Sequence, residues 1–327
     1  MKEKNEIQDI PDVPDEIISA AQHGRLVLFI GAGLSRIIGC PSWDEFACLF
    51  LKVLYEKKII NYHEYEKLQH LDARKLLSIC RKLYEKKLGK KSLDFIKSFL
   101  TAKDDLNEKF NIYDNLYSFN AIYVTTNYDD YLDKVAQRSI KNTTYINSSN
   151  SIENPIEKDS SKNNIIYKKE ELLISNLING YVIHLHGSIL DESNLILTVT
   201  DYIKHYKPDS KSVILLEEIF KNYTVLFVGY GLEEFEILEL LVSKSNPSKQ
   251  EVKHFMLYPI FKNEINLLKF YEEYYKELGI QLVPYPIDEN GYEHLAEVIS
   301  TWAKIIGPQS RPQDFLEKIK LIDEVLK

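Results

Sequence analysis

The chain has 327 residues, of which 44% are hydrophobic and 28% charged, and its formal net charge is −8 at pH 7. This balance is typical of a globular protein large enough for one domain with an inserted lobe. The acidic charge argues against a nucleic-acid-binding surface, and no apolar run is long enough to cross a bilayer. No apolar core follows Met1 to make a signal peptide, so we expect a cytoplasmic protein. From the charge and the hydropathy we expect neither nucleic-acid nor membrane partners.

The cysteines are Cys40, Cys48 and Cys80, and they include no Cys-x-x-Cys pair. We therefore expect neither a disulfide framework nor a structural zinc site, and the sequence predicts no bound metal. A reducing compartment fits this use of cysteine.

The predicted elements begin with a short helix over 13–24 and a buried strand over 25–30. Residues 43–118 show helical periodicity without a strong strand candidate, which predicts a helical lobe inserted between two strands. A strand over 121–125 follows, and then a helix that begins at Tyr131. The polar stretch at about 138–164 is rich in Asn, Ser and Lys and predicts a long loop or insert.

Further strands are predicted at 181–185, 195–198, 224–228, 255–258 and 280–283, and further helices at 211–222, 233–244, 263–278 and 291–306. Alternating strands and helices predict an α/β fold: a Rossmann-like, mostly parallel sheet with helices on both faces. We expect this domain to span residues 1–308. Residues 309–327 place apolar side chains along one helical stripe, which predicts a C-terminal helix that packs on its own domain or on a neighbouring subunit.

The strand at 25–30 runs directly into Gly31-Ala-Gly33, and Ser35 follows. Glycine lets a backbone approach a ligand closely, so this turn can direct N–H groups at a phosphate or can simply join strand and helix. A hydride-transfer fingerprint would have a third glycine where Arg36 stands, and an acidic residue where 50–52 are Phe, Leu and Lys. An ordinary dehydrogenase is therefore disfavoured.

Three further predicted strands also end in glycine or compact polar clusters, namely Thr126–Asp130, His186–Ser188 and Gly229–Leu232. In open α/β sheets, ligands bind beyond the carboxyl ends of the strands. Four such strand ends in one chain therefore favour a binding site over a purely structural sheet.

Each cluster also has a simpler explanation. Asn127 could cap a helix, and His186 could be a hydrogen-bonded turn histidine. Gly229 and Gly231 could merely permit close packing of a helix on a strand. His184 lies two residues before His186, on the same face of the strand, and is predicted to be structural.

Together the motifs resemble those of the sirtuin family. Gly31-Ala-Gly-Leu-Ser35, followed by Gly39-Cys-Pro41, is similar to the sirtuin opening Gly-Ala-Gly-x-Ser-x3-Gly-Ile-Pro at identical spacing. Thr125-Thr-Asn-Tyr-Asp129 resembles the sirtuin Thr-Gln-Asn-Ile-Asp motif. Leu185-His-Gly187 resembles the His-Gly motif, and Val228-Gly-Tyr-Gly231 stands where sirtuins have a later glycine or serine turn.

The resemblance covers about residues 20–290 and has clear departures. Ser42-Trp-Asp44 stands where sirtuins have Asp-Phe-Arg, and no cysteine pair follows the His-Gly motif to form a zinc module. No Phe-Gly-Glu segment follows Ser188 to hold an acyl-lysine peptide. This pattern resembles the divergent sirtuin-like NAD hydrolases of bacterial anti-phage systems, which implies NAD+ as a substrate that is cut to ADP-ribose and nicotinamide. A sirtuin-type deacylase and a non-catalytic scaffold that binds NAD+ or ADP-ribose are the alternatives.

The resemblance implies roles for the motif residues. Asn127 would hold the ribose hydroxyls or a water, and His186 would be the general base, so these two are the predicted catalytic residues. Asp129 would orient the nicotinamide carboxamide. The predicted NAD+-binding residues are Gly31, Ala32, Gly33, Ser35, Asp129, Gly229 and Gly231. An effector that destroys NAD+ must be kept inactive until needed, so we expect control by self-assembly into a homo-oligomer or by a partner protein. The resemblance suggests a ring-forming ATPase or an Argonaute-like protein as that partner.

Overall fold

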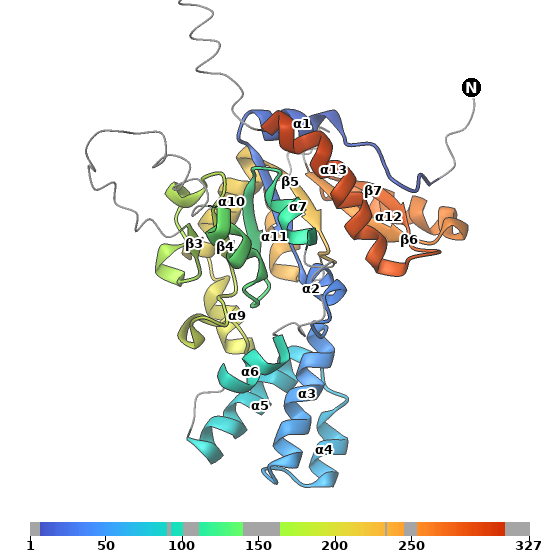
Figure 1. Cartoon of the computed structure of the whole chain (residues 1–327). Coiled ribbons are helices and arrows are strands. Elements are labelled where there is room, and N and C mark those ends of the chain that lie inside the picture. The colour runs from blue at the N-terminus through green and yellow to red at the C-terminus, as the bar shows by residue number, and fades with distance from the viewer. Residues whose placement is uncertain are drawn as a thin grey trace, which may run out of the picture.

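The centre of the computed structural model is a seven-stranded sheet in the order β3-β4-β2-β1-β5-β6-β7, in which every neighbouring pair is parallel (Figure 1). The structure describes residues 7–89, 93–100, 111–139, 164–232, 234–244 and 254–310. The strands are β1 (Leu26–Ile30), β2 (Ile122–Thr125), β3 (Ile165–Ile166), β4 (Val182–His184), β5 (Thr224–Val228), β6 (His254–Ile260) and β7 (Ile280–Pro286). The prediction of a Rossmann-like α/β fold is confirmed.

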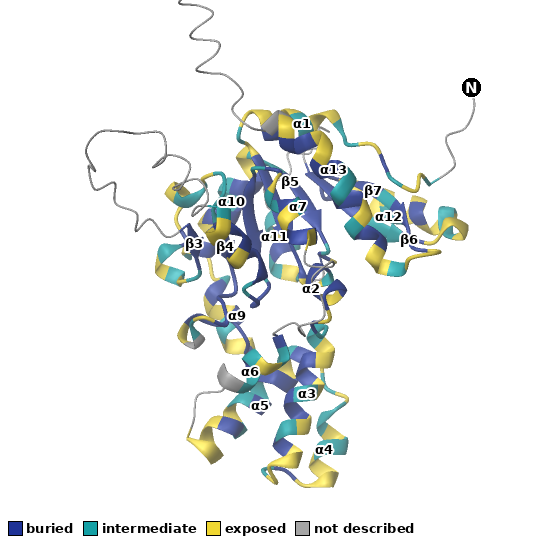
Figure 2. Cartoon of the chain, viewed as in Figure 1, coloured by how far each residue is buried: buried dark blue, intermediate teal, exposed yellow. Residues whose placement is uncertain are grey.

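The strands are almost wholly apolar because helices cover both faces of the sheet (Figure 2). Alternate side chains of β1 enter two separate cores: Leu26 and Leu28 on one face, Val27 and Phe29 on the other. The first core is closed by α1 (Asp15–Gln22), α7 (Asn111–Tyr117), a helix over 131–139, and α13 (His294–Ser310). The second is closed by α10 (Lys211–Asn222), α11 (Phe235–Lys244) and α12 (Ile265–Glu277).

A helical lobe extends from the carboxyl edge of the sheet (Figure 1). It contains α3 (Trp43–Glu56), α4 (Tyr62–Leu68), α5 (Ala73–Leu88) and α6 (Leu93–Leu100), and it has a core of its own around Phe50 and Leu77. A capping box begins α3, where the Ser42 side chain accepts from the Glu45 N–H and the Glu45 side chain accepts from the Ser42 N–H. The last helix of the predicted 43–118 lobe, α7, packs against α13 of the sheet domain instead.

Two strand predictions differ from the structure. The predicted strand at 195–198 is an extended segment outside the sheet, where the Ile196 N–H donates to the His186 carbonyl oxygen at 2.9 Å. Thr198 then caps α9 (Val199–His205), a helix that the sequence did not predict. Conversely, β3 escaped prediction because two residues are too short to show any periodicity. Short 3₁₀ helices lie at Lys169–Glu171, Ile174–Asn176, Glu192–Asn194, Lys262–Glu264 and Gly291–Glu293.

Two predicted segments fall largely outside the described residues: 140–163 of the polar insert and 311–327 of the C-terminal helix. Among the residues that the structure describes, no helix is long and apolar enough to cross a membrane. Within the same ranges, no group of three or more His, Cys, Asp or Glu side chains is placed to hold a metal ion.

Candidate functional site

The four strands that carry the motifs are neighbours, in the order β4-β2-β1-β5. Thr125 is the register partner of both His184 on β4 and Ile30 on β1, and Ile30 in turn pairs with Val228 on β5. Because these strands are parallel, the segments that follow them leave the sheet at one edge. The structure therefore brings all four predicted motifs together at the carboxyl edge.

The glycine turn after β1 lies in direct backbone contact with the glycine turn after β5. The Gly31 N–H donates to the Val228 carbonyl at 3.0 Å, and the Gly33 N–H donates to the Gly229 carbonyl at 2.8 Å. A Cβ on Gly31 would lie 2.6 Å from the Gly229 carbonyl oxygen, and a Cβ on Gly33 would lie 2.7 Å from it. This close approach requires glycine, and it occupies both N–H groups with protein acceptors.

One residue of each turn is exposed to solvent. Ala32 begins α2 (Ala32–Ile37) and is the exposed residue of the first turn. In the second turn Gly229 has a left-handed φ of +59°, which favours glycine. Gly231 is exposed, and its carbonyl oxygen lies 3.5 Å from the Tyr275 hydroxyl.

Asn127 is held by a buried network. Its Nδ2 donates to the Gly31 carbonyl at 3.0 Å and to the Ser35 hydroxyl at 2.9 Å. The Ser35 hydroxyl donates to Oδ2 of Asp129 at 2.6 Å. Burial raises the pKa of the Asp129 carboxyl, although the Ser35 hydrogen bond opposes the shift. Among the described residues no group donates to Oδ1 of Asn127, so this oxygen is available to accept from a ligand.

His184 fixes the backbone of Asn127. Its Nδ1 lies 3.0 Å from the Asn127 carbonyl oxygen, and its Nε2 lies 2.8 Å from Oδ1 of Asp133. Burial disfavours the imidazolium, but the charge and hydrogen bond of Asp133, the Asn127 carbonyl and the Asp129 charge together outweigh burial and raise the pKa of His184. The structural role predicted for His184 agrees with these contacts.

His186 is enclosed by aromatic side chains, and its own side chain is only 2% exposed. Its Nε2 lies 2.7 Å from the Tyr206 hydroxyl and 3.4 Å from Oε2 of Glu234. Its Nδ1 lies 3.5 Å from the Tyr202 hydroxyl. Burial lowers the pKa of His186 well below its usual value, so the imidazole is neutral at neutral pH, as a general base must be.

Sequence reasoning missed a cluster beside His186. Tyr202 and Tyr206 lie four residues apart, on and just after α9, and Glu234 precedes α11. From the lobe, Arg74 pairs with Glu236 at 3.0 Å, and its guanidinium carbon lies 4.2 Å from the Tyr202 ring centroid. The only local signals were an acidic residue soon after the β5 glycines and tyrosines at helical spacing. Neither pattern is specific.

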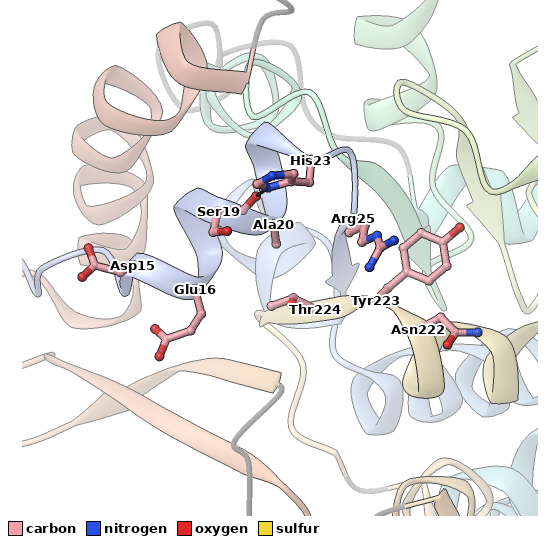
Figure 3. A pocket seen from close by; sticks show the side chains of 9 residues that line it. All are labelled: Asp15, Glu16, Ser19, Ala20, His23, Arg25, Asn222, Tyr223 and Thr224. Atoms are coloured by element: carbon pink, nitrogen blue, oxygen red, sulfur yellow. Dashed lines mark hydrogen bonds between the residues drawn. The ribbon is translucent and has the colours of Figure 1, made fainter.

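A hollow of about 770 Å³ lies at the opposite edge of the sheet (Figure 3). It is lined by Asp15, Glu16, Ser19, Ala20, His23, Arg25, Asn222, Tyr223 and Thr224. Arg25 immediately precedes β1, and Thr224 is the first residue of β5, so this hollow lies at the amino ends of the strands. It is separate from the motif cluster.

The comparisons with known proteins agree with the motif cluster. Residues 121–282 match the model of the SIR2-like domain. Over 311 residues the chain is 25% identical to the Defense-associated sirtuin 2 of Bacillus subtilis, an alignment that covers 93% of this chain and 27% of that protein. The chain thus spans about a quarter of the length of this relative. The matched domain includes Asn127, His186 and Glu234 and begins after the Gly31 turn.

Proposed function

This chain is a divergent sirtuin-like protein, and from that premise we propose that it hydrolyses NAD+ to ADP-ribose and nicotinamide. The observation that carries the proposal is the arrangement at the ends of β2 and β4. There a fixed Asn127, whose amide oxygen accepts from none of the described residues, and a neutral His186 follow adjacent strands. A purely structural sheet edge needs neither group.

Hydrolysis of NAD+ requires few further groups from the protein. Cleavage of the nicotinamide–ribose bond develops positive charge at C1′, as in other glycosidic cleavages, and nicotinamide leaves as a neutral molecule. The oxygen of the attacking water bonds to C1′ while the electron pair of the C–N bond departs with nicotinamide. One proton of the water must then be accepted, and His186 is the base for it.

Asn127 orients the ribose or the water through its Oδ1. Ser35 and Asp129 would act on NAD+ mainly through Asn127, because the hydroxyl and the carboxylate bind each other and the amide. Ala32, which is exposed in the turn after β1, would contact the pyrophosphate, and Gly31, Gly33 and Gly229 set the shape of the turns.

We further propose that the NAD+-cleaving activity serves bacterial defence, as the name of the Bacillus subtilis relative suggests for that protein. An enzyme that destroys NAD+ would be toxic, so it must be restrained until needed. Assembly into a homo-oligomer or activation by a partner protein would supply that control, and a cytoplasmic site of action gives access to NAD+.

The test is incubation of the full chain with NAD+, with and without an acylated peptide, with the products separated by chromatography. We expect ADP-ribose and nicotinamide without peptide. Asn127→Ala and His186→Ala should each lower the rate by about 10²–10⁴-fold. His63→Ala, on an exposed position of α4, should retain the wild-type rate. Peptide-dependent turnover would identify a deacylase instead, and NAD+ binding without turnover would identify a scaffold.

A further inference from the structure

Three polar atoms from three separate segments meet on one side of His186. They are Nε2 of His186, which follows β4, the hydroxyl of Tyr206 at the end of α9, and Oε2 of Glu234 before α11. The Tyr206 hydroxyl lies 2.7 Å from Nε2 and 3.4 Å from Oε2, and Nε2 lies 3.4 Å from Oε2. None of the sirtuin-like motifs includes Tyr206 or Glu234.

Hydrogen-bonding rules restrict where the protons lie. An ionised carboxylate can only accept, and a phenol has one hydrogen to donate. The Tyr206 hydroxyl donates its one hydrogen to the ionised Glu234, and its oxygen then accepts from an N–H at Nε2 of His186. The hydrogen of a neutral His186 then lies on Nε2, and Nδ1 keeps its lone pair. The Tyr202 hydroxyl lies 3.5 Å from Nδ1, at the outer limit of hydrogen-bond distance, so any hydrogen bond that it donates to this lone pair is weak.

We propose that Glu234 is a positioning residue that acts through Tyr206 on His186, so that Nδ1 of His186 is the atom that accepts the proton during hydrolysis. This inference rests on the proposed NAD+ hydrolysis. As the water oxygen bonds to C1′ and nicotinamide leaves, one proton of the water passes to Nδ1. The proton on Nε2 passes to the Tyr206 oxygen, and the hydrogen of Tyr206 passes to Oε2 of Glu234. His186 ends neutral with its hydrogen on Nδ1. The starting tautomer returns when the Glu234 proton passes back through Tyr206 to Nε2 and Nδ1 releases its proton to solvent.

The charges around Glu234 fit a proton acceptor. Burial raises the pKa of Glu234 to about 7, and Arg74 opposes that shift. Arg74 is already paired with Glu236, so its charge is shared between two carboxylates. The titratable groups that face the His186–Glu234 pair are Arg74 on α5, Tyr128 after β2, Tyr202, His205 and Tyr206 on and after α9, Tyr230 after β5, and Glu236 on α11.

The expected kinetics follow from this arrangement. Glu234→Gln and Tyr206→Phe should each lower kcat by about 10–100-fold, less than the 10²–10⁴-fold loss expected when the base itself is removed. KM for NAD+ should be unchanged, since neither residue is proposed to touch the substrate. The matched control is Glu239→Gln, the same substitution at an exposed position of α11, which should retain wild-type kcat.

The pH profile separates this role from a packing role. Wild-type kcat should fall as the pH drops below about 7, because a protonated Glu234 cannot accept the proton. His186 does not cause this fall, the acidic limb of the profile, since its pKa is depressed and it stays neutral over the same pH range. Glu234→Gln should abolish the limb and give a low, flat profile from about pH 6 to about pH 8. A variant that merely loosens the fold would keep the wild-type pH dependence.

Selective ¹⁵N-histidine NMR tests the same idea without any turnover. Above pH 7, where Glu234 is ionised, wild-type His186 should be the neutral tautomer with hydrogen on Nε2, and Glu234→Gln should shift the population toward hydrogen on Nδ1. Hydrogen on Nδ1 in the wild type, or an unchanged acidic limb in Glu234→Gln, would overturn the inference. Failure of the proposed function is a different result: no ADP-ribose from the wild type, whatever the tautomer of His186.

Discussion

Nδ1 of His184 lies 3.0 Å from the backbone carbonyl oxygen of Asn127, so a buried histidine holds the segment that carries the predicted catalytic amide. The other ring nitrogen of this histidine faces Asp133 at 2.8 Å, and both side chains are at most 2% exposed. A carbonyl oxygen only accepts hydrogen bonds, so Nδ1 must donate. The Asp133–His184 pair therefore fixes the position of the Asn127 backbone.

Removal of Asp133 should destabilise the fold. Asp133→Ala leaves a buried histidine without its charge partner, and breaking such a pair costs about 3–5 kcal/mol. Asp133→Asn keeps the shape and a hydrogen bond to Nε2, so it should lose less. Urea unfolding measures both free energies, with Glu239→Ala as the exposed control. Equal stability of Asp133→Ala and wild type would show that the pair contributes nothing.

The same pair should make stability depend on pH. The pKa of His184 is raised above its ordinary 6.5, so the folded state binds the proton more tightly than the unfolded chain does. This contribution is fully present below about pH 6.5 and is lost as the pH rises through the folded pKa. The difference in unfolding free energy between wild type and Asp133→Asn should therefore shrink as the pH rises above 6.5. A constant difference across that range would contradict the assignment.

Gly31→Ala should lower the free energy of unfolding, although the extended backbone conformation of Gly31 suits any residue. The new Cβ would lie 2.6 Å from the Gly229 carbonyl oxygen, and a backbone atom cannot rotate away. Separation of the two turns should lower the unfolding free energy by about 1–3 kcal/mol, as overpacking does elsewhere. Ala32→Ser, at the exposed neighbouring position, should stay within about 0.5 kcal/mol of wild type. Chemical denaturation of the three proteins in parallel measures both effects.

Arg74→Ala should move the acidic limb of NAD+ hydrolysis to higher pH. Arg74 lowers the pKa of Glu234, so its removal raises that pKa and Glu234 is protonated at a higher pH. Lys75→Ala, exposed on the same helix, removes an equal charge and should leave the limb in place. The measurement is kcat as a function of pH for the wild type, Arg74→Ala and Lys75→Ala. A shift to lower pH for Arg74→Ala would contradict the proposed role of Glu234.

The elements predicted from sequence were those with a strong local signal. β1 is a continuous apolar run of five residues and β5 has four apolar residues after Thr224, and each strand leads into the glycines that the structure places in contact. The segment 195–198 has the same local appearance but finds no place in the sheet. It packs instead beside the loop after β4 and against the lobe. Local pattern cannot distinguish those two outcomes, because tertiary packing decides them.

The residues of the candidate site likewise include some with a local sequence signal and some without one. Asn127 and His186 stand in short motifs at strand ends, so the sequence was sufficient to propose them as candidates. Glu234 and Tyr206 reach His186 only through the packing of α9 and α11, and Arg74 meets Glu236 across 162 residues of chain. Such contacts leave no signal in one sequence, and only the fold reveals them.

NAD+ hydrolysis is tested most directly by the product formed when the full chain is given NAD+ alone, followed by NMR of the ribose anomeric proton. We expect conversion to ADP-ribose and free nicotinamide, and loss of that conversion in a folded Asn127→Ala/His186→Ala double variant. Intact NAD+ with the wild type, or an unchanged rate in the folded double variant, would contradict it.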